Sequence, residues 1–218
     1  MRLLAFRKRL FIRKSKGEHF MEYSIRIYKV EKEDSNLRGF VSITFDHVFC
    51  AKSIALKESQ KGSFYLEMPK YKEYGTEEYV PFFAFKDQKF RKAVTEQVKE
   101  AYQKMEDKMV DLKETWGDEE LYYDLSVLPT KGNDTFKGEV SMKLQDVFVI
   151  HQMHIIQGWN GKTFVGMPQR ENSYKNERED IAHPIEADFK QELEAAIMEE
   201  YQRKQEFSQN QRQHRAAR

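Results

Sequence analysis

The sequence predicts an α+β protein made of two tandem modules, each an antiparallel sheet of about four to five strands followed by a C-terminal helix. Three observations support this prediction: an internal repeat, alternating apolar and polar residues early in each copy, and apolar residues at helical spacing at the end of each copy. The chain has 218 residues, which is long enough for such modules to bury a core.

The repeat is found by aligning the chain with itself at an offset of 99 residues. Positions 39–102 then match positions 138–201 without a gap, with 12 identities over 64 positions. Identical pairs occur along the whole alignment, including Gly39 with Gly138, Val48-Phe49 with Val147-Phe148, Met68-Pro69 with Met167-Pro168, and Tyr102 with Tyr201. We therefore interpret the chain as a tandem duplication.

The strands are predicted in the first part of each copy. In the first copy Val41, Ile43 and Phe45 alternate with polar residues, and residues 140–144 of the second copy repeat this pattern. Such an alternation is typical of an antiparallel strand with one buried face. The runs 47–56 and 147–156 are apolar on both faces and are predicted to be central strands. Each copy then has a short strand that ends at Met-Pro.

A helix is predicted at the end of each copy. Apolar residues recur there every four positions, at Phe90, Val94, Val98 and Tyr102 in the first copy and at Phe189, Leu193, Ile197 and Tyr201 in the second. This spacing places the apolar side chains on one helix face, which we expect to pack on the sheet. Glu186 and Asp188 lie at the predicted start of the second helix, where the helix dipole favours negative charge.

Five segments follow from these patterns. We assign a basic N-terminal segment (1–20), the first repeat (21–106), a linker (107–121), the second repeat (122–203) and a basic tail expected to be disordered (204–218). The alternative for the tail is a basic arm that grips a phosphate backbone.

The net charge of +1 is an average over unequal segments. Residues 1–20 have a net charge of +6, residues 21–111 of 0, residues 112–202 of −9 and residues 203–218 of +4. The near-zero net charge therefore does not exclude binding to nucleic acid.

The first twenty residues raise a question about the translation start. Codons for Lys16-Gly17-Glu18 can contain a purine-rich ribosome-binding sequence, so one hypothesis is that translation starts at Met21. The protein would then have a net charge of 1 − 6 = −5. The alternatives for residues 1–20 are a basic surface anchor and a secretory signal, and the latter lacks a clean apolar region.

Several classes of site are not supported by the sequence. The single cysteine, Cys50, excludes an internal disulfide and any site with several cysteines. No apolar run approaches the ~18 residues of a membrane span. His151 and His154 are three positions apart in a strand, so we expect them on opposite faces rather than at a metal. No motif supplies a nucleophile with an oxyanion site, so we predict a protein without catalysis, metal or cofactor.

Two stretches of the second copy resemble the SpoVG family of bacterial sporulation and septation regulators. These are Asp146–Pro168, which contains Asn160-Gly161 and ends in Phe164-Val165-Gly166-Met167-Pro168, and Asp180–Ile185, DIAHPI. The residue before Asp180 is Glu179, where the family usually has Arg. The resemblance covers residues 122–203. The first copy, 23–104, resembles a diverged module because residues 79–85 replace the DIAHPI segment.

The resemblance implies an intramolecular pseudo-dimer, because modules of this family pair through their sheets. It also implies a cytoplasmic regulator that binds DNA, RNA or both through a basic loop and the terminal helix. The candidate nucleic-acid-binding residues are Lys70, Lys72, Lys89, Arg91, Lys92, Arg170, Lys175, Arg178, Arg203 and Lys204. Tyr71, Tyr74 and Tyr79 could stack on bases, and the alternative for them is cross-strand packing.

Other functions remain open from the sequence. The basic candidates could form an ordinary solvated surface, since Glu171, Glu177 and Glu179 lie among those of the second copy. The main alternative function is a protein-interaction module in septation, in which the acidic second repeat meets a basic protein partner. A hydrolase is a more distant alternative. Further self-association through sheet edges is also expected, and no membrane partner is.

Overall fold

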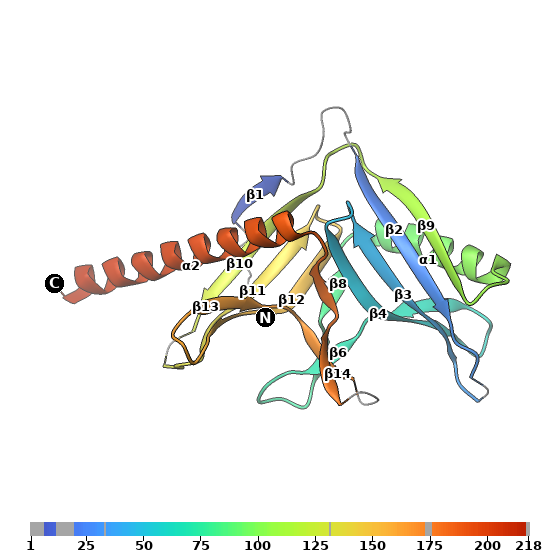
Figure 1. The fold of residues 1–218 in the computed structure, drawn as a ribbon, viewed down its shortest axis with the longest axis horizontal. Helices are drawn as coiled ribbons and strands as arrows, with labels where there is room; N and C mark the ends of the chain where they lie inside the picture. The colour runs from blue at the N-terminus through green and yellow to red at the C-terminus, as the bar shows by residue number, and fades with distance from the viewer. Residues whose placement is uncertain (1–6, 12–19, 33, 131, 173–175, 217–218) are drawn as a thin grey trace.

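The structure is a computed structural model that describes residues 7–11, 20–32, 34–130, 132–172 and 176–216. Within these ranges the chain forms two six-stranded antiparallel sheets, two small two-stranded hairpins and two helices. Figure 1 shows the two sheets side by side, with α2 crossing one sheet at the front and α1 lying behind the other. The predicted α+β class with two sheet-and-helix modules is confirmed.

The first sheet comes mainly from the first repeat. Its strand order is β16-β4-β3-β2-β9, with β5 beside β4. The first repeat contributes β2 (Met21–Lys29), β3 (Leu37–Phe45), β4 (Phe49–Glu58) and β5 (Phe64–Glu67). Val41, Ile43 and Phe45 of β3 are buried as the alternation predicts, because this face of the sheet packs on the core.

The second sheet repeats this arrangement. Its order is β1-β10-β11-β12-β13, with β8 beside β12. The second repeat contributes β10 (Tyr122–Pro129), β11 (Phe136–Leu144), β12 (Phe148–Gln157) and β13 (Thr163–Gly166). Val140, Met142 and Leu144 of β11 are buried in the positions that match the buried residues of β3. The backbone duplication predicted from the 99-residue offset is thus visible strand by strand.

The two halves exchange a short strand. Strand β8 (Phe83–Phe85) of the first repeat pairs with β12, and β16 (Ala182–Pro184) of the second repeat pairs with β4. The aromatic core crosses the same boundary, since the ring centroid of Phe148 lies 5.2 Å from that of Phe45 and 5.4 Å from that of Phe83. The two repeats are therefore joined as an intramolecular pseudo-dimer with one continuous core.

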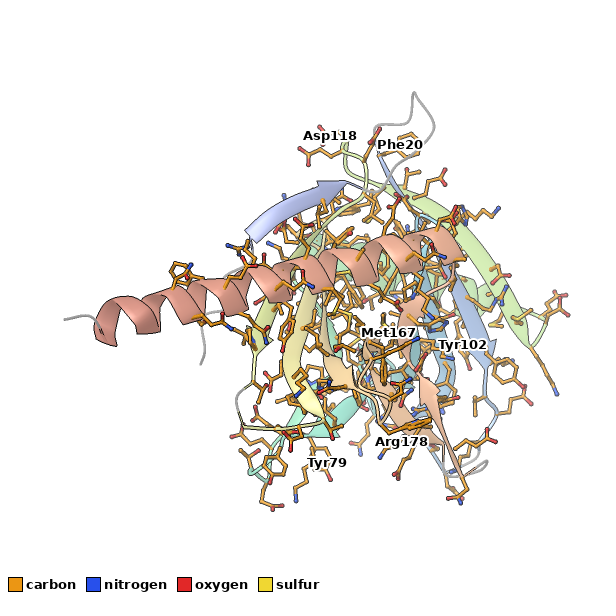
Figure 2. The ribbon with its side chains drawn as sticks, turned by 60° about the vertical axis from the view of Figure 1, so that its left-hand side comes forward. Phe20, Tyr79, Tyr102, Asp118, Met167 and Arg178 are labelled. Carbon is orange, nitrogen blue, oxygen red and sulfur yellow. The ribbon has the colours of Figure 1, made fainter. Side chains whose placement is uncertain are left out.

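Each repeat also forms a small hairpin between its sheet and its exchanged strand. We call the hairpin of β6 (Lys70–Lys72) and β7 (Tyr79–Pro81) the first arm, residues 70–81. The second arm, residues 169–180, consists of β14 (Gln169–Asn172) and β15 (Glu177–Asp180). Figure 2 shows Tyr79 of the first arm and Arg178 of the second at the lower end of the molecule, opposite Asp118 and Phe20.

The segment predicted as a linker contains an edge strand. Strand β9 (Met109–Trp116) pairs with β2 over its whole length and extends the first sheet. Val110, Leu112 and Trp116 alternate with polar residues in this strand, and this pattern is typical of a strand. From the sequence alone the segment is assigned to a linker, because it has no counterpart in the second repeat. In the second sheet the same edge is covered by β1 (Arg7–Phe11), which pairs with β10.

The two helices begin where the sequence predicts. Helix α1 (Gln88–Lys104) is capped by Asp87, whose side chain accepts a hydrogen bond from the amide of Phe90 at 2.6 Å. Helix α2 (Ala187–Ala216) is longer, and it continues through residues 204–216 that were expected to be disordered. Only its first part lies on the sheet through the predicted apolar positions, and Figure 1 shows the remainder extending beyond the sheet.

The prediction that His151 and His154 face opposite sides of the sheet is wrong. A β-bulge in β12 shifts the register between Val140 and Met142 of the neighbouring strand, and Gln152 adopts a positive φ of 62°. The extra residue changes the side-chain parity, so both histidines lie on the face away from α2 and line one cavity. The first repeat has the same bulge at Ser53, with a φ of 66°.

Candidate nucleic-acid interface

The start of α1 is the most basic surface among the predicted site residues. Lys89, Arg91 and Lys92 are exposed, and within the described ranges none of the three forms an ion pair. The first turn contains no acidic residue, and the carboxylate at this helix end belongs to the capping residue Asp87. An anion approaching this surface therefore meets three free cations on adjacent turns.

The matching start of α2 has the opposite charge. Residues 86–104 contain six basic and three acidic side chains, a net charge of +3. Residues 185–203, at the 99-residue offset, contain two basic and six acidic side chains, a net charge of −4. A polyanion would be attracted to the first helix and repelled by the second.

The basic residues of the first arm are exposed but partly compensated. The ammonium of Lys72 lies 2.8 Å from the carboxylate of Glu77, and that of Lys70 lies 3.9 Å from Glu67. Because both pairs are exposed to solvent, each is worth little and can open when a phosphate approaches. Tyr79 and Tyr74 on this arm are exposed, whereas Tyr71 packs against Phe82 at a centroid distance of 4.9 Å.

The basic residues of the second arm face carboxylates across the hairpin. Arg170 lies opposite Glu179 and its guanidinium donates a hydrogen bond to that carboxylate at 3.0 Å. Arg178 lies opposite Glu171 in the same ladder and is exposed. Lys175, a predicted candidate, lies outside the described residues. This arm therefore offers less uncompensated positive charge than the start of α1.

The two candidates on α2 are used within the protein. The guanidinium of Arg203 contacts Glu200 at 2.6 Å, and this hydrogen bond is the main reason that the pKa of Glu200 is lowered. Lys204 donates a hydrogen bond to the carbonyl oxygen of Val127 at 2.6 Å, which ties α2 to β10. Contact with phosphate would require Lys204 to leave this bond.

The structure divides the predicted residues into separate groups. The two arms lie together at one end of the molecule (Figures 1 and 2), whereas α1 and α2 lie on their respective sheets. Sequence reasoning missed Lys86, which lies just before Asp87 and adds a fourth basic residue beside the start of α1. Lys86 lies two residues before the helix and close in sequence to the other three basic residues, which could have identified it as a member of this cluster.

Two other kinds of site are absent from the described part of the chain. No three His, Cys, Asp or Glu side chains within it are placed to hold a metal ion. None of its helices is long and apolar enough to cross a membrane.

Comparison with known proteins identifies both repeats. The model of the SpoVG family matches residues 21–104 and 122–203. A septation protein SpoVG of Caldanaerobacter subterraneus subsp. tengcongensis is 37% identical over 87 residues, which are 93% of that protein and 40% of this chain. Those of Thermoanaerobacter sp. (strain X514) and Acholeplasma laidlawii are 36% and 37% identical over 88% and 81% of their lengths, or 38% and 36% of this chain. The chain therefore belongs to the SpoVG family and contains two tandem copies of its module.

Proposed function

We propose that this protein is a regulator that binds DNA or RNA without catalysis and acts in septation in the bacterial cytoplasm. The observation that supports it best is the start of α1, where Lys89, Arg91 and Lys92 are exposed and have no ion pair within the described ranges. Free cations on one surface neutralise phosphates and release counterions. The relatives' naming as septation proteins supports the cellular role.

The proposed contact surface is asymmetric. The start of α1 binds the phosphate backbone, and the exposed Lys70 and Lys72 of the first arm add contacts. The acidic start of α2 and the second arm, where Arg170 is paired with Glu179, contribute less. One chain thus presents one basic helix start, in contrast to a symmetric homodimer, which presents two.

The test is a salt titration of binding with the full chain on duplex DNA and on RNA. Replacing Lys89, Arg91 and Lys92 together by Gln should weaken binding to duplex DNA. It should also reduce the slope of log K against log salt by about 3, since each phosphate that the variant no longer neutralises accounts for ~0.9 of the slope. The control replaces Lys99 and Lys104 on the same helix, whose ammonium groups lie near Glu96 and Glu100. Binding that is absent at low salt with both ligands would overturn the proposal, and an unchanged slope would remove α1 from it.

A second candidate function is supported by the acidic half. Residues 185–203 place five carboxylates on α2 and one just before it, and a basic protein partner would complement them. Under this alternative the chain acts in septation through protein contacts, and wild-type protein shows no salt-dependent binding to either nucleic acid.

A further inference from the structure

The first arm forms a cavity with the outer face of the second sheet. This cavity has a volume of about 400 Å³, within the range of ligand-binding pockets. Tyr71 and Glu73 of the arm form one wall, and Glu139, His151 and His154 of the second sheet form the floor. The bulge at Gln152 creates this floor, because without it the two histidines would lie on opposite faces.

Two carboxylates in this cavity lack an ion pair within the described ranges, and the positive charge of Lys86 acts on the His151 side of the floor. Glu73 and Glu139 form no ion pair with any residue of the described ranges. Burial raises the pKa of the Tyr71 hydroxyl, a hydrogen bond with Gln152 partly offsets this rise, and the negative charges of Glu73 and Glu139 add to it. Both carboxylates therefore act on the same hydroxyl from the two sides of the cavity, one from the arm and one from the sheet.

The two histidines of the floor each offer one hydrogen-bond acceptor. Burial lowers the pKa of His151 and of His154, so both rings are neutral near pH 7 and each has one acceptor nitrogen. The Nδ1 of His151 lies 3.0 Å from the hydroxyl of Ser141.

We propose that this cavity binds an ammonium or guanidinium cation. Both groups are positively charged and only donate hydrogen bonds, which matches two carboxylates without an ion pair beside the acceptor nitrogens of two neutral histidines. Phosphate would be repelled by Glu73 and Glu139. The cation comes either from a small polyamine or from a Lys or Arg side chain of a protein partner. The proposal is independent of nucleic-acid binding at α1.

The matching position on the first sheet lacks this chemistry. At the 99-residue offset Glu139 corresponds to Phe40, His154 to Ala55, and His151 to Lys52. The arm residues Tyr71 and Glu73 correspond to Arg170 and Asn172. The two halves share the backbone and the bulge. The carboxylates and histidines of the cavity, however, occur only on the second sheet and the first arm and have no counterparts at the matching positions.

The experiment uses isothermal titration calorimetry of the full chain with two probes, spermidine and Nα-acetyl-arginine amide. We expect at least one probe to bind one equivalent, and the double variant Glu73→Gln/Glu139→Gln to weaken that binding tenfold or more. Glu78→Gln, on the same arm but outside the cavity, is the matched control and should bind as the wild type does. NMR signals of the His151 and His154 rings should shift during the titration.

The results separate the two sources and can overturn the proposal. Binding of spermidine alone assigns a free polyamine, and binding of the arginine amide assigns a side chain of a partner. If neither probe binds at millimolar concentration, the proposal is wrong. Equal affinity of wild type and double variant, with circular dichroism showing both folded, also overturns it. Histidine signals that respond to Zn²⁺ and to neither probe would replace it with a metal site.

Discussion

The two repeats share a backbone and differ in the side chains on their outer faces. Each has a bulge at the same position, Ser53 or Gln152, and each sends a short strand to the other sheet. Their helix starts and arm-covered faces nevertheless have opposite chemistry. In a symmetric homodimer every substitution occurs twice, so the two halves cannot diverge. Joining the modules in one chain removes that constraint. The buried residues of the two halves then stay similar and preserve the fold, while the exposed residues diverge.

The exchanged strands show how unequal the halves have become. Strand β8 inserts Phe83 and Phe85, whereas β16 inserts Ala182 and Pro184 at the matching positions. Phe83 is fully buried, and its ring lies 5.4 Å from that of Phe148. The first repeat therefore supplies more of the apolar packing that joins the two halves.

The largest expected effect comes from removing the Phe83 ring. Phe83→Ala should lower the free energy of unfolding by about 3–5 kcal/mol, because it deletes a buried ring and leaves a cavity at the boundary. Urea unfolding followed by fluorescence of Trp116, which packs on Phe90, measures it. Tyr79→Ala is the control, since Tyr79 is exposed and should change stability by less than about 0.5 kcal/mol. A decrease below about 1 kcal/mol would show that β8 is not part of the cooperative core.

Much of this fold could be predicted from the sequence. The 99-residue offset located the matching strands, and helical spacing located both helices, because buried faces keep their periodicity. The linker prediction left out β9 because a strand at a sheet edge needs no repeat counterpart. The tail prediction placed the end of α2 too early, because the polar residues 204–216 are long-chained and favour a helix even without a packing face.

The candidate site was predicted less well. The positions of Lys89, Arg91 and Lys92 on one helix start followed from sequence, but the use of Lys204 by the carbonyl of Val127 is a tertiary interaction between distant residues. The cavity was missed because a bulge reverses side-chain parity. The first repeat contained a signal of this bulge. Its buried positions change from odd numbers, Phe49 and Ala51, to even numbers, Ile54 and Leu56.

A second comparison concerns two equivalent glycines. A Cβ at Gly39 would lie 2.6 Å from the carbonyl oxygen of Tyr28, whereas one at Gly138 would lie 3.1 Å from that of Leu128. Gly39→Ala must displace the neighbouring strand and should cost about 1–3 kcal/mol of stability. Gly138→Ala should cost less, and both are measured by urea unfolding. A larger decrease at Gly138 would contradict the closer approach of the neighbouring strand at Gly39.

A smaller effect is expected where α2 meets β10. Lys204→Met keeps the methylene chain and removes the donor to the Val127 carbonyl, so it should cost about 1 kcal/mol of stability. Arg203→Met removes an exposed pair with Glu200 and should cost no more than about 0.5 kcal/mol. The same two variants should leave the salt slope of nucleic-acid binding unchanged. A slope reduced by Lys204→Met would instead place this lysine at the phosphate backbone.

The smallest effect is a pH dependence that arises from the two histidines of β12. Burial lowers the pKa of both His151 and His154; nearby Lys86 lowers that of His151 further, and Glu139 partly offsets the lowering at His154. The unfolded chain then binds more protons as pH falls below ~6.5, the ordinary histidine value, so stability present above that pH is lost as pH falls through the folded pKa values.

Urea unfolding between pH 5 and pH 7.5 measures this dependence in the wild type and in the double variant His151→Gln/His154→Gln. The variant should show a shallower decrease of stability below pH 6.5, with a constant difference from the wild type above pH 7. Lys52 and Ala55 occupy the matching positions of the first sheet, so those positions hold no histidine. Parallel curves for the two proteins would mean that these two histidines do not contribute to the acid sensitivity.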